Sequence, residues 1–180
     1  MEDIKAYHSS HLNHPLVLRN FNKPFHCDGC KEQGFGTRYR CESSDCHPLP
    51  PLPSVPGCMF NSRTATHEFY PGCDLKFSDE PRKRGTWCNA CGNEINGFVY
   101  YCKDKDLDLH PCCLELKGKM VTDGATFRLH DKVKSKCIWC KSKSLKGKSE
   151  GGWSYKSECN KYHVHVCYRN DSSELENRGI

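Results

Sequence analysis

Three Cys-x-x-Cys pairs are the feature that most restricts how this chain can fold. They are Cys27/Cys30, Cys88/Cys91 and Cys137/Cys140. Two cysteines separated by two residues can place both sulfur atoms on one metal ion in a tight turn, and zinc prefers four thiolate or imidazole ligands in a tetrahedron. The surrounding sequence repeats as well, because ten residues lead from the first pair to Cys41 and ten from the second pair to Cys102. We therefore expect three copies of one small unit.

The composition argues against a single large hydrophobic core. Of the 180 residues, 36% are hydrophobic, below the roughly 45–50% of typical globular proteins, while there are 15 cysteines and 10 histidines. Chains that cannot bury enough apolar surface usually add disulfides or metals. An odd number of cysteines cannot all pair within the chain, and no signal peptide or transmembrane segment is predicted. We therefore expect an intracellular protein, in the cytoplasm and/or nucleus, with reduced thiols that bind metal.

Histidine and cysteine residues follow the second and third pairs at distances that complete zinc sites. The predicted ligands are Cys88, Cys91, His110 and Cys113 in the second unit, and Cys137, Cys140, His165 and Cys167 in the third. Four protein ligands leave no coordination position for water, so this zinc would be structural rather than catalytic. The alternatives are buried structural cysteines or redox pairs, but a thioredoxin-like pair needs a βαβ setting that is not evident here.

Short strands are predicted upstream of each pair, at 14–18, 73–77 and 125–129, because apolar residues alternate there. A short helix is predicted from Cys113. Stretches 61–66, 78–85 and 117–124 are polar or contain Gly and Pro, which is typical of linkers. The sequence therefore predicts small zinc-stabilised modules with short antiparallel strands and little helix, in three tandem units at 8–60, 64–116 and 124–170.

Five segments carry a family resemblance. They are His67-Glu-Phe-Tyr-Pro-Gly-Cys73, Trp87-Cys-Asn-Ala-Cys-Gly92, Asn96-Gly-Phe-Val-Tyr-Tyr-Cys102, Asp108-Leu-His-Pro-Cys-Cys113 and Trp153-Ser-Tyr-Lys-Ser-Glu-Cys159. These segments look very much like the plant cysteine/histidine-rich divergent C-one domain family, which is related to the phorbol-ester/diacylglycerol-type zinc fingers of protein kinase C. The resemblance extends over about residues 8–168.

The resemblance implies two interleaved zinc sites in each unit and hence further ligands. For the first unit these are Cys27, Cys30 and Cys58 at an inner site, and His14, Cys41, Cys46 and His67 at an outer site. For the outer site of the second unit only Cys73 and Cys102 remain, and Lys105 stands where a cysteine is expected. Ala125 and Ser157 occupy ligand positions in the third unit. We therefore expect about three to four structural zinc ions per chain.

The first unit lacks a clear fourth ligand at its inner site. Val55 stands at the expected histidine position, and five prolines lie in segment 47–57. His47 is one candidate for the fourth ligand, and the alternatives are solvent or no zinc. Cys112 and Cys159 are spare thiols near sites, each either a fallback ligand or simply buried. The proline-rich segment should resemble polyproline, because proline cannot donate to a β-ladder.

The resemblance implies a non-enzymatic protein that binds a protein partner in intracellular signalling or stress responses. Diacylglycerol binding is not expected, because the loop between Cys30 and Cys41 is short and polar. The net charge of +5 is small, but lysines crowd the stretch Lys132 to Lys148, where nucleic acid or anionic lipid could bind instead. Thiol redox activity of the Cys-x-x-Cys pairs is a weaker alternative, since it requires a reactive thiolate that is not bound to metal.

Overall fold

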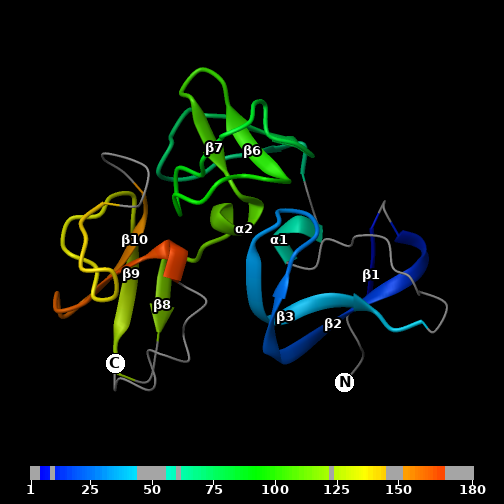
Figure 1. Cartoon of the computed structure of the whole chain (residues 1–180), viewed down its shortest axis with the longest axis horizontal. Coiled ribbons are helices and arrows are strands. Elements are labelled where there is room, and N and C mark those ends of the chain that lie inside the picture. Colours follow the sequence, from blue (N-terminus) through cyan, green and yellow to red (C-terminus); the bar gives the residue numbers. More distant parts are fainter. Residues whose placement is uncertain are drawn as a thin grey trace.

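The computed structural model describes residues 5–8, 11–43, 56–59, 62–121, 124–144 and 152–168. These residues form three antiparallel sheets joined by loops, with two α-helices of a single turn and one short 3-10 helix (Figure 1). The two α-helices lie at the centre, where the three sheets meet. None of the helices in these ranges has the length and apolar character needed to cross a membrane.

The first sheet has the order β1-β2-β3, with β1 at Lys5–His8, β2 at His11–His26 and β3 at Gln33–Cys41. Strands β2 and β3 form a long hairpin, paired from Leu16↔Cys41 to His26↔Gln33. Helix α1, Pro56–Met59, follows this sheet. Its Met59 packs with Ala6, Leu16, Tyr39 and Cys41 in a small core of its own.

The second sheet has the order β4-β5-β6-β7 and ends in helix α2. Its elements are β4 (Thr64–Ala65), β5 (Leu75–Ser78), β6 (Val99–Cys102), β7 (Leu107–Leu109) and α2 (Pro111–Leu114). The third sheet has the order β11-β10-β9-β8. Its elements are β8 (Lys119–Val121), β9 (Thr126–His130), β10 (Ser154–Ser157), β11 (His163–His165) and the 3-10 helix η1 (Val166–Tyr168).

The predicted fold class is confirmed as mostly short antiparallel strands with little helix. The predicted strand at 14–18 falls within β2, and those at 73–77 and 125–129 overlap β5 and β9 but begin one or two residues too early. The predicted linkers 61–66 and 117–124 are wrong in part, because they contain the short edge strands β4 and β8, whose backbones pair with β5 and β9. The predicted helix begins two residues early, at Pro111, because proline suits the first helical position. Most of segment 47–57 lies outside the described residues.

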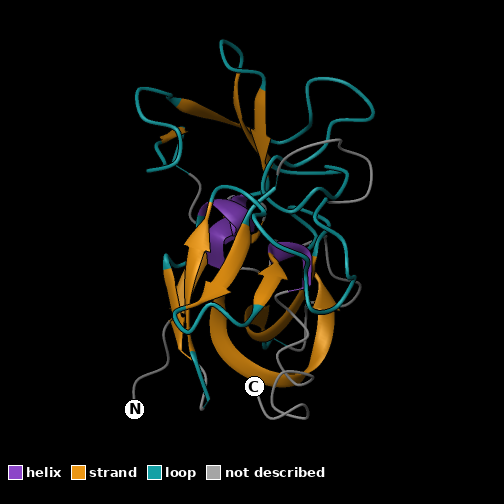
Figure 2. Ribbon diagram, turned by 90° about the vertical axis from the view of Figure 1, so that its left-hand side faces the viewer, coloured by secondary structure: helices purple, strands orange, loops and turns teal. Residues whose placement is uncertain are grey.

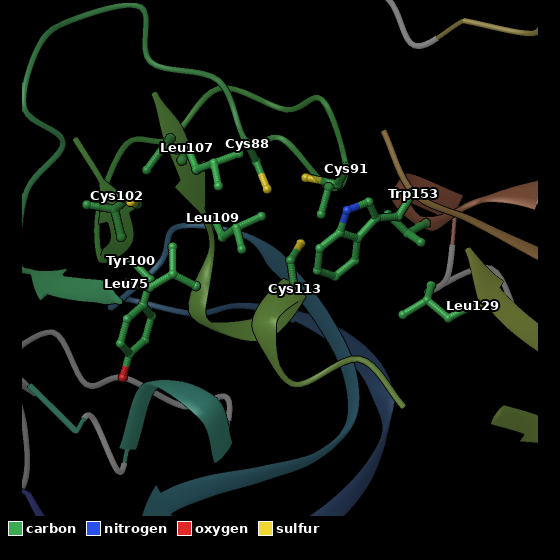
Figure 3. Close-up of a cluster of buried hydrophobic side chains, with 14 of the residues drawn as sticks. Leu75, Cys88, Cys91, Tyr100, Cys102, Leu107, Leu109, Cys113, Leu129 and Trp153 are labelled. Carbon is green, nitrogen blue, oxygen red and sulfur yellow. The ribbon is translucent and has the colours of Figure 1, made fainter. Parts of the chain in front are cut away.

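The second and third sheets share one hydrophobic core. Leu75, Leu109 and Val99 of the second sheet belong to the same buried cluster as Phe127 and Trp153 of the third. Trp153 is fully buried and lies beside Cys91 and Cys113 (Figure 3), and its backbone N–H donates to the Ala90 carbonyl at 2.7 Å. Its indole Nε1–H donates to the Tyr70 hydroxyl at 3.3 Å. The two sheets therefore pack as one unit.

The first sheet docks on the second through the turn at residues 27–32. The Phe98 N–H donates to the Gly29 carbonyl at 2.9 Å, and the Asn93 amide donates to Glu32 Oε2 at 3.0 Å. A Cβ atom on Gly97 would collide with the Gly29 carbonyl oxygen, so only glycine lets the two backbones approach this closely. Helices α1 and α2 pack against each other beside this contact (Figure 2).

Candidate metal centres

The backbone forms the same type of turn at each of the three Cys-x-x-Cys segments. In each, the residue after the second cysteine donates its N–H to the carbonyl of the first, over 2.8 Å from Lys31 and 2.9 Å from Gly92 and Lys141. The first cysteine donates its own N–H to the carbonyl five residues later. The turn requires a left-handed residue, with φ of 63° at Lys31, 74° at Gly92 and 58° at Lys141. The same local geometry therefore presents two sulfur atoms at three places in the chain.

The second cluster, Cys88, Cys91, His110 and Cys113, is fully formed. Its four ligand atoms lie within 4.8 Å of one another, and all four residues are buried. His110 Nδ1 lies 3.4 Å from the Cys91 sulfur and 4.0 Å from the Cys113 sulfur. Figure 3 shows the three sulfur atoms pointing toward one another, next to Trp153. The turn supplies the first two residues, while the end of β7 and helix α2 supply the others, so the predicted combination is brought together.

The electrostatics of the second cluster favour shared protons and a thiolate–imidazolium arrangement. Burial opposes charge on Cys88, but hydrogen bonds from Cys113 and Cys91 and the charge of His110 hold its pKa well below the usual value. A hydrogen bond from Cys112 contributes most to a Cys113 pKa of about 6. Burial opposes charge on His110, but the charge of Cys88 together with hydrogen bonds to Cys113 and Cys88 raises the His110 pKa well above its usual value. Since zinc ligands must be deprotonated, such a cluster is suited to exchange its protons for a metal ion.

The third cluster brings together three of its four predicted ligands. Cys137, Cys140 and His165 have their ligand atoms within 4.8 Å of one another, with His165 Nδ1 3.5 Å from the Cys140 sulfur. Cys167 lies outside this group but close to it. Burial and then the neighbouring Cys137 and Cys140 raise the Cys167 pKa to about 12. The 3-10 helix that carries Cys167 begins directly after His165. The His165 side chain joins the two cysteines of the Cys137–Cys140 turn, and the Cys167 side chain does not.

The first cluster consists of Cys27, Cys30 and Cys58, three buried cysteines whose sulfur atoms lie within 4.8 Å of one another. Helix α1 brings Cys58 to the turn, although most of the chain between Cys41 and Cys58 lies outside the described residues. Hydrogen bonding with Cys112, Cys27 and Cys58, together with burial, raises the Cys30 pKa. His47, the predicted candidate for a fourth ligand, lies outside the described residues.

The ligands predicted for outer sites occupy separate places. Cys73 and Cys102 lie together, and burial followed by their mutual hydrogen bond raises the Cys73 pKa to about 11. Cys41 is buried in the small core of the first sheet. The His67 ring instead stacks on Trp153, with centroids 4.5 Å apart and planes at 26°. Among the described residues, no cluster of three or more ligands includes His14 or Cys41, and Cys46 lies outside those residues.

One site residue, Glu32, was missed by the sequence reasoning. Its Oε1 atom lies 3.5 Å from Nε2 of His110, on the opposite side of the imidazole from the cluster sulfurs. A carboxylate in this position can orient a metal-binding histidine and raise its basicity. Glu32 lies in the first Cys-x-x-Cys turn, and only the docking of that turn brings it to His110, so no local sequence signal could have found it.

The sheets and clusters define a small β-protein with Cys/His sites of the zinc-finger type. The comparison with known families agrees for the central part of the chain, because residues 67–114 match the model of the C1 domain family. This segment, which contains the complete second cluster, is a C1-like cysteine/histidine-rich domain, as the resemblance predicted. No curated protein and no solved structure matches the chain.

Proposed function

We propose that this chain is a non-enzymatic, zinc-stabilised interaction protein built from three tandem C1-like units at 8–60, 64–116 and 124–170. The observation that carries the proposal is the second cluster, in which three cysteines and one histidine, all buried, form a closed ligand set. A closed set stabilises structure but leaves no open position for a substrate or water. The match of residues 67–114 to the C1 family further favours a binding role.

The same turn at all three Cys-x-x-Cys segments supports one structural zinc per unit. A protein partner is the proposed ligand, in an adaptor role within signalling or stress responses. The proposal includes a reducing compartment, the cytoplasm and/or nucleus, because thiols stay reduced there and available to metal. No disulfide bond joins the cysteines among the described residues.

Zinc content per chain tests this function directly. Native mass spectrometry before and after a chelator, followed by circular dichroism, should show three or four bound zinc ions and loss of folding on removal. Binding at each site contributes on the order of 10 kcal/mol to folding, so a folded metal-free chain is not expected. One or no zinc would overturn the proposal. A mass loss of two hydrogens per cysteine pair would then indicate disulfides and favour thiol redox activity instead.

A second candidate function is binding of nucleic acid or anionic lipid through the lysines of the third unit. Within the described part of Lys132–Lys148, five lysines are exposed on the loop between β9 and β10: Lys132, Lys134, Lys136, Lys141 and Lys143. Contacts between lysines and phosphate groups release counterions. The affinity for a DNA duplex or an anionic vesicle should therefore fall steeply between low and moderate salt. Binding that does not respond to salt would count against this candidate.

A further inference from the structure

Cys112 lies beside the first cluster, although its sulfur atom is not among the three that lie within 4.8 Å of one another. The Cys112 side chain packs against the three buried cysteines of that cluster, Cys27, Cys30 and Cys58. Its sulfur atom is within hydrogen-bonding reach of the Cys30 sulfur. Structural zinc sites almost always have four ligands, so the three thiols together with Cys112 provide the number and the type of donor that zinc requires.

The geometry of α2 explains how one helix can serve two clusters. Consecutive residues of an α-helix point in directions about 100° apart. Cys113 points into the second cluster, and Cys112 is therefore turned toward α1. The two helices are in close contact, because a Cβ atom added to Gly57 would meet the Glu115 carboxylate at 2.5 Å and the Pro111 carbonyl oxygen at 3.2 Å. Because of this contact, Cys58, the neighbour of Gly57, lies on the same side of α2 as Cys112.

The second cluster has no need of Cys112. The Cys112 sulfur also reaches Cys113 by a hydrogen bond, so it lies between the two clusters. However, the second cluster already has four ligand atoms within 4.8 Å of one another, whereas the first has three. Because a structural zinc site closes at four ligands, the available coordination position is in the first cluster.

We propose that Cys112 completes a four-cysteine metal site with Cys27, Cys30 and Cys58, so that the adjacent residues Cys112 and Cys113 bind two different ions. The proposal rests on the proposed zinc binding and assigns the fourth ligand to a residue of the next unit. Four thiolates on a zinc ion leave a charge of about −2, against about −1 for three thiolates and a histidine. The metal would then fasten α1 to α2 and couple the first sheet to the second.

The ligands can be identified in the unsubstituted chain loaded with cadmium-113, a metal that also prefers thiolates. Proton–cadmium correlation spectra detect coupling between each bound ion and the β protons of its cysteine ligands. We expect one ion that couples to Cys27, Cys30, Cys58 and Cys112, and a second that couples to Cys88, Cys91 and Cys113. A first-cluster ion coupled to His47, or to three cysteines alone, would overturn the proposal, as would coupling of Cys112 to the second ion.

Zinc counting in variants gives an independent test. Cys112→Ser should bind one zinc fewer per chain than the unsubstituted protein in native mass spectrometry. His47→Ala and the matched control Cys159→Ser should keep the full count, since Cys159 is exposed and hydrogen-bonded to Ser157. An unchanged count in Cys112→Ser would overturn the proposal while leaving the proposed function intact. Absence of metal from every cluster would overturn both.

Discussion

Glu32 and His110 lie 3.5 Å apart, carboxylate to imidazole, although Glu32 precedes β3 of the first sheet and His110 follows β7 of the second. His110 has its Nδ1 atom on the cluster sulfurs, so its Nε2 atom faces the carboxylate. The first sheet thus contributes a positioning residue to the second cluster. Metal affinity in one unit should therefore depend on a side chain of its neighbour.

Replacement of Glu32 tests this dependence. Glu32→Gln keeps the shape of the side chain but removes the charge, and we expect the affinity of the second cluster for zinc to fall about tenfold. Competition with a chromophoric chelator would measure the change. Glu42→Gln is the matched control, because Glu42 forms an exposed ion pair with Arg19 and should leave affinity unchanged. Equal affinities for the two variants would show that Glu32 does not act on His110.

Truncation of Trp153 tests the shared core of the second and third sheets. Trp153→Ala should lower the free energy of unfolding by about 3–5 kcal/mol, because the indole is fully buried. Trp87→Ala is the matched control: Trp87 is 41% exposed, and its truncation should lower the free energy of unfolding by clearly less than that of Trp153. Urea unfolding with zinc in excess would measure both. Separate unfolding transitions for the two sheets would contradict a common core.

His67 should make stability depend on pH. Burial lowers the His67 pKa from its usual 6.5, more than Glu68 raises it, so the unfolded chain binds a proton more readily than the folded chain. The neutral, stacked ring therefore makes its full contribution to the free energy of unfolding above pH 6.5, and this contribution falls as the pH drops below that value. The difference in thermal stability between the unsubstituted protein and His67→Gln should shrink as the pH falls from about 8 to about 5. A constant difference would contradict this assignment.

Gly97 should tolerate no side chain. Gly97→Ala places a methyl group against the backbone carbonyl of Gly29, so the first sheet must move away from the second, at a cost of about 1–3 kcal/mol. In Gly118→Ala the new Cβ atom would meet only the Glu68 side chain at 3.7 Å, and little change is expected. Chemical denaturation would compare the two variants. Equal stabilities would mean that the contact between Gly97 and Gly29 does not hold the sheets together.

The sequence was most informative where structure is local. The Cys-x-x-Cys turn is fixed by a few backbone hydrogen bonds, so its spacing alone predicted the pairs, and the His-x-x-Cys spacing further along the chain predicted His110 and Cys113. Cys167 was placed less well, because one residue fewer after His165 puts it in a 3-10 turn outside the three-residue group. The edge strands β4 and β8 have little hydrophobic pattern, and pairing rather than composition creates them.

The remaining features depend on how the sheets dock, which a single sequence does not encode locally. Glu32 approaches His110 and Cys112 approaches Cys30 only because the first turn rests on the loop before β6. His67 was assigned to an outer metal site by resemblance, yet its ring stacks on Trp153, far along the chain. Such contacts form between residues that no repeat or motif connects.

The hydrogen bond from Phe98 to the Gly29 carbonyl has a consequence for synthesis. Residues 27–32 leave the ribosome well before residues 93–98. The first turn therefore has no docking partner until that later segment has been synthesised. The speed at which the intervening residues are translated should therefore set how long the Gly29 carbonyl remains without this hydrogen-bond partner.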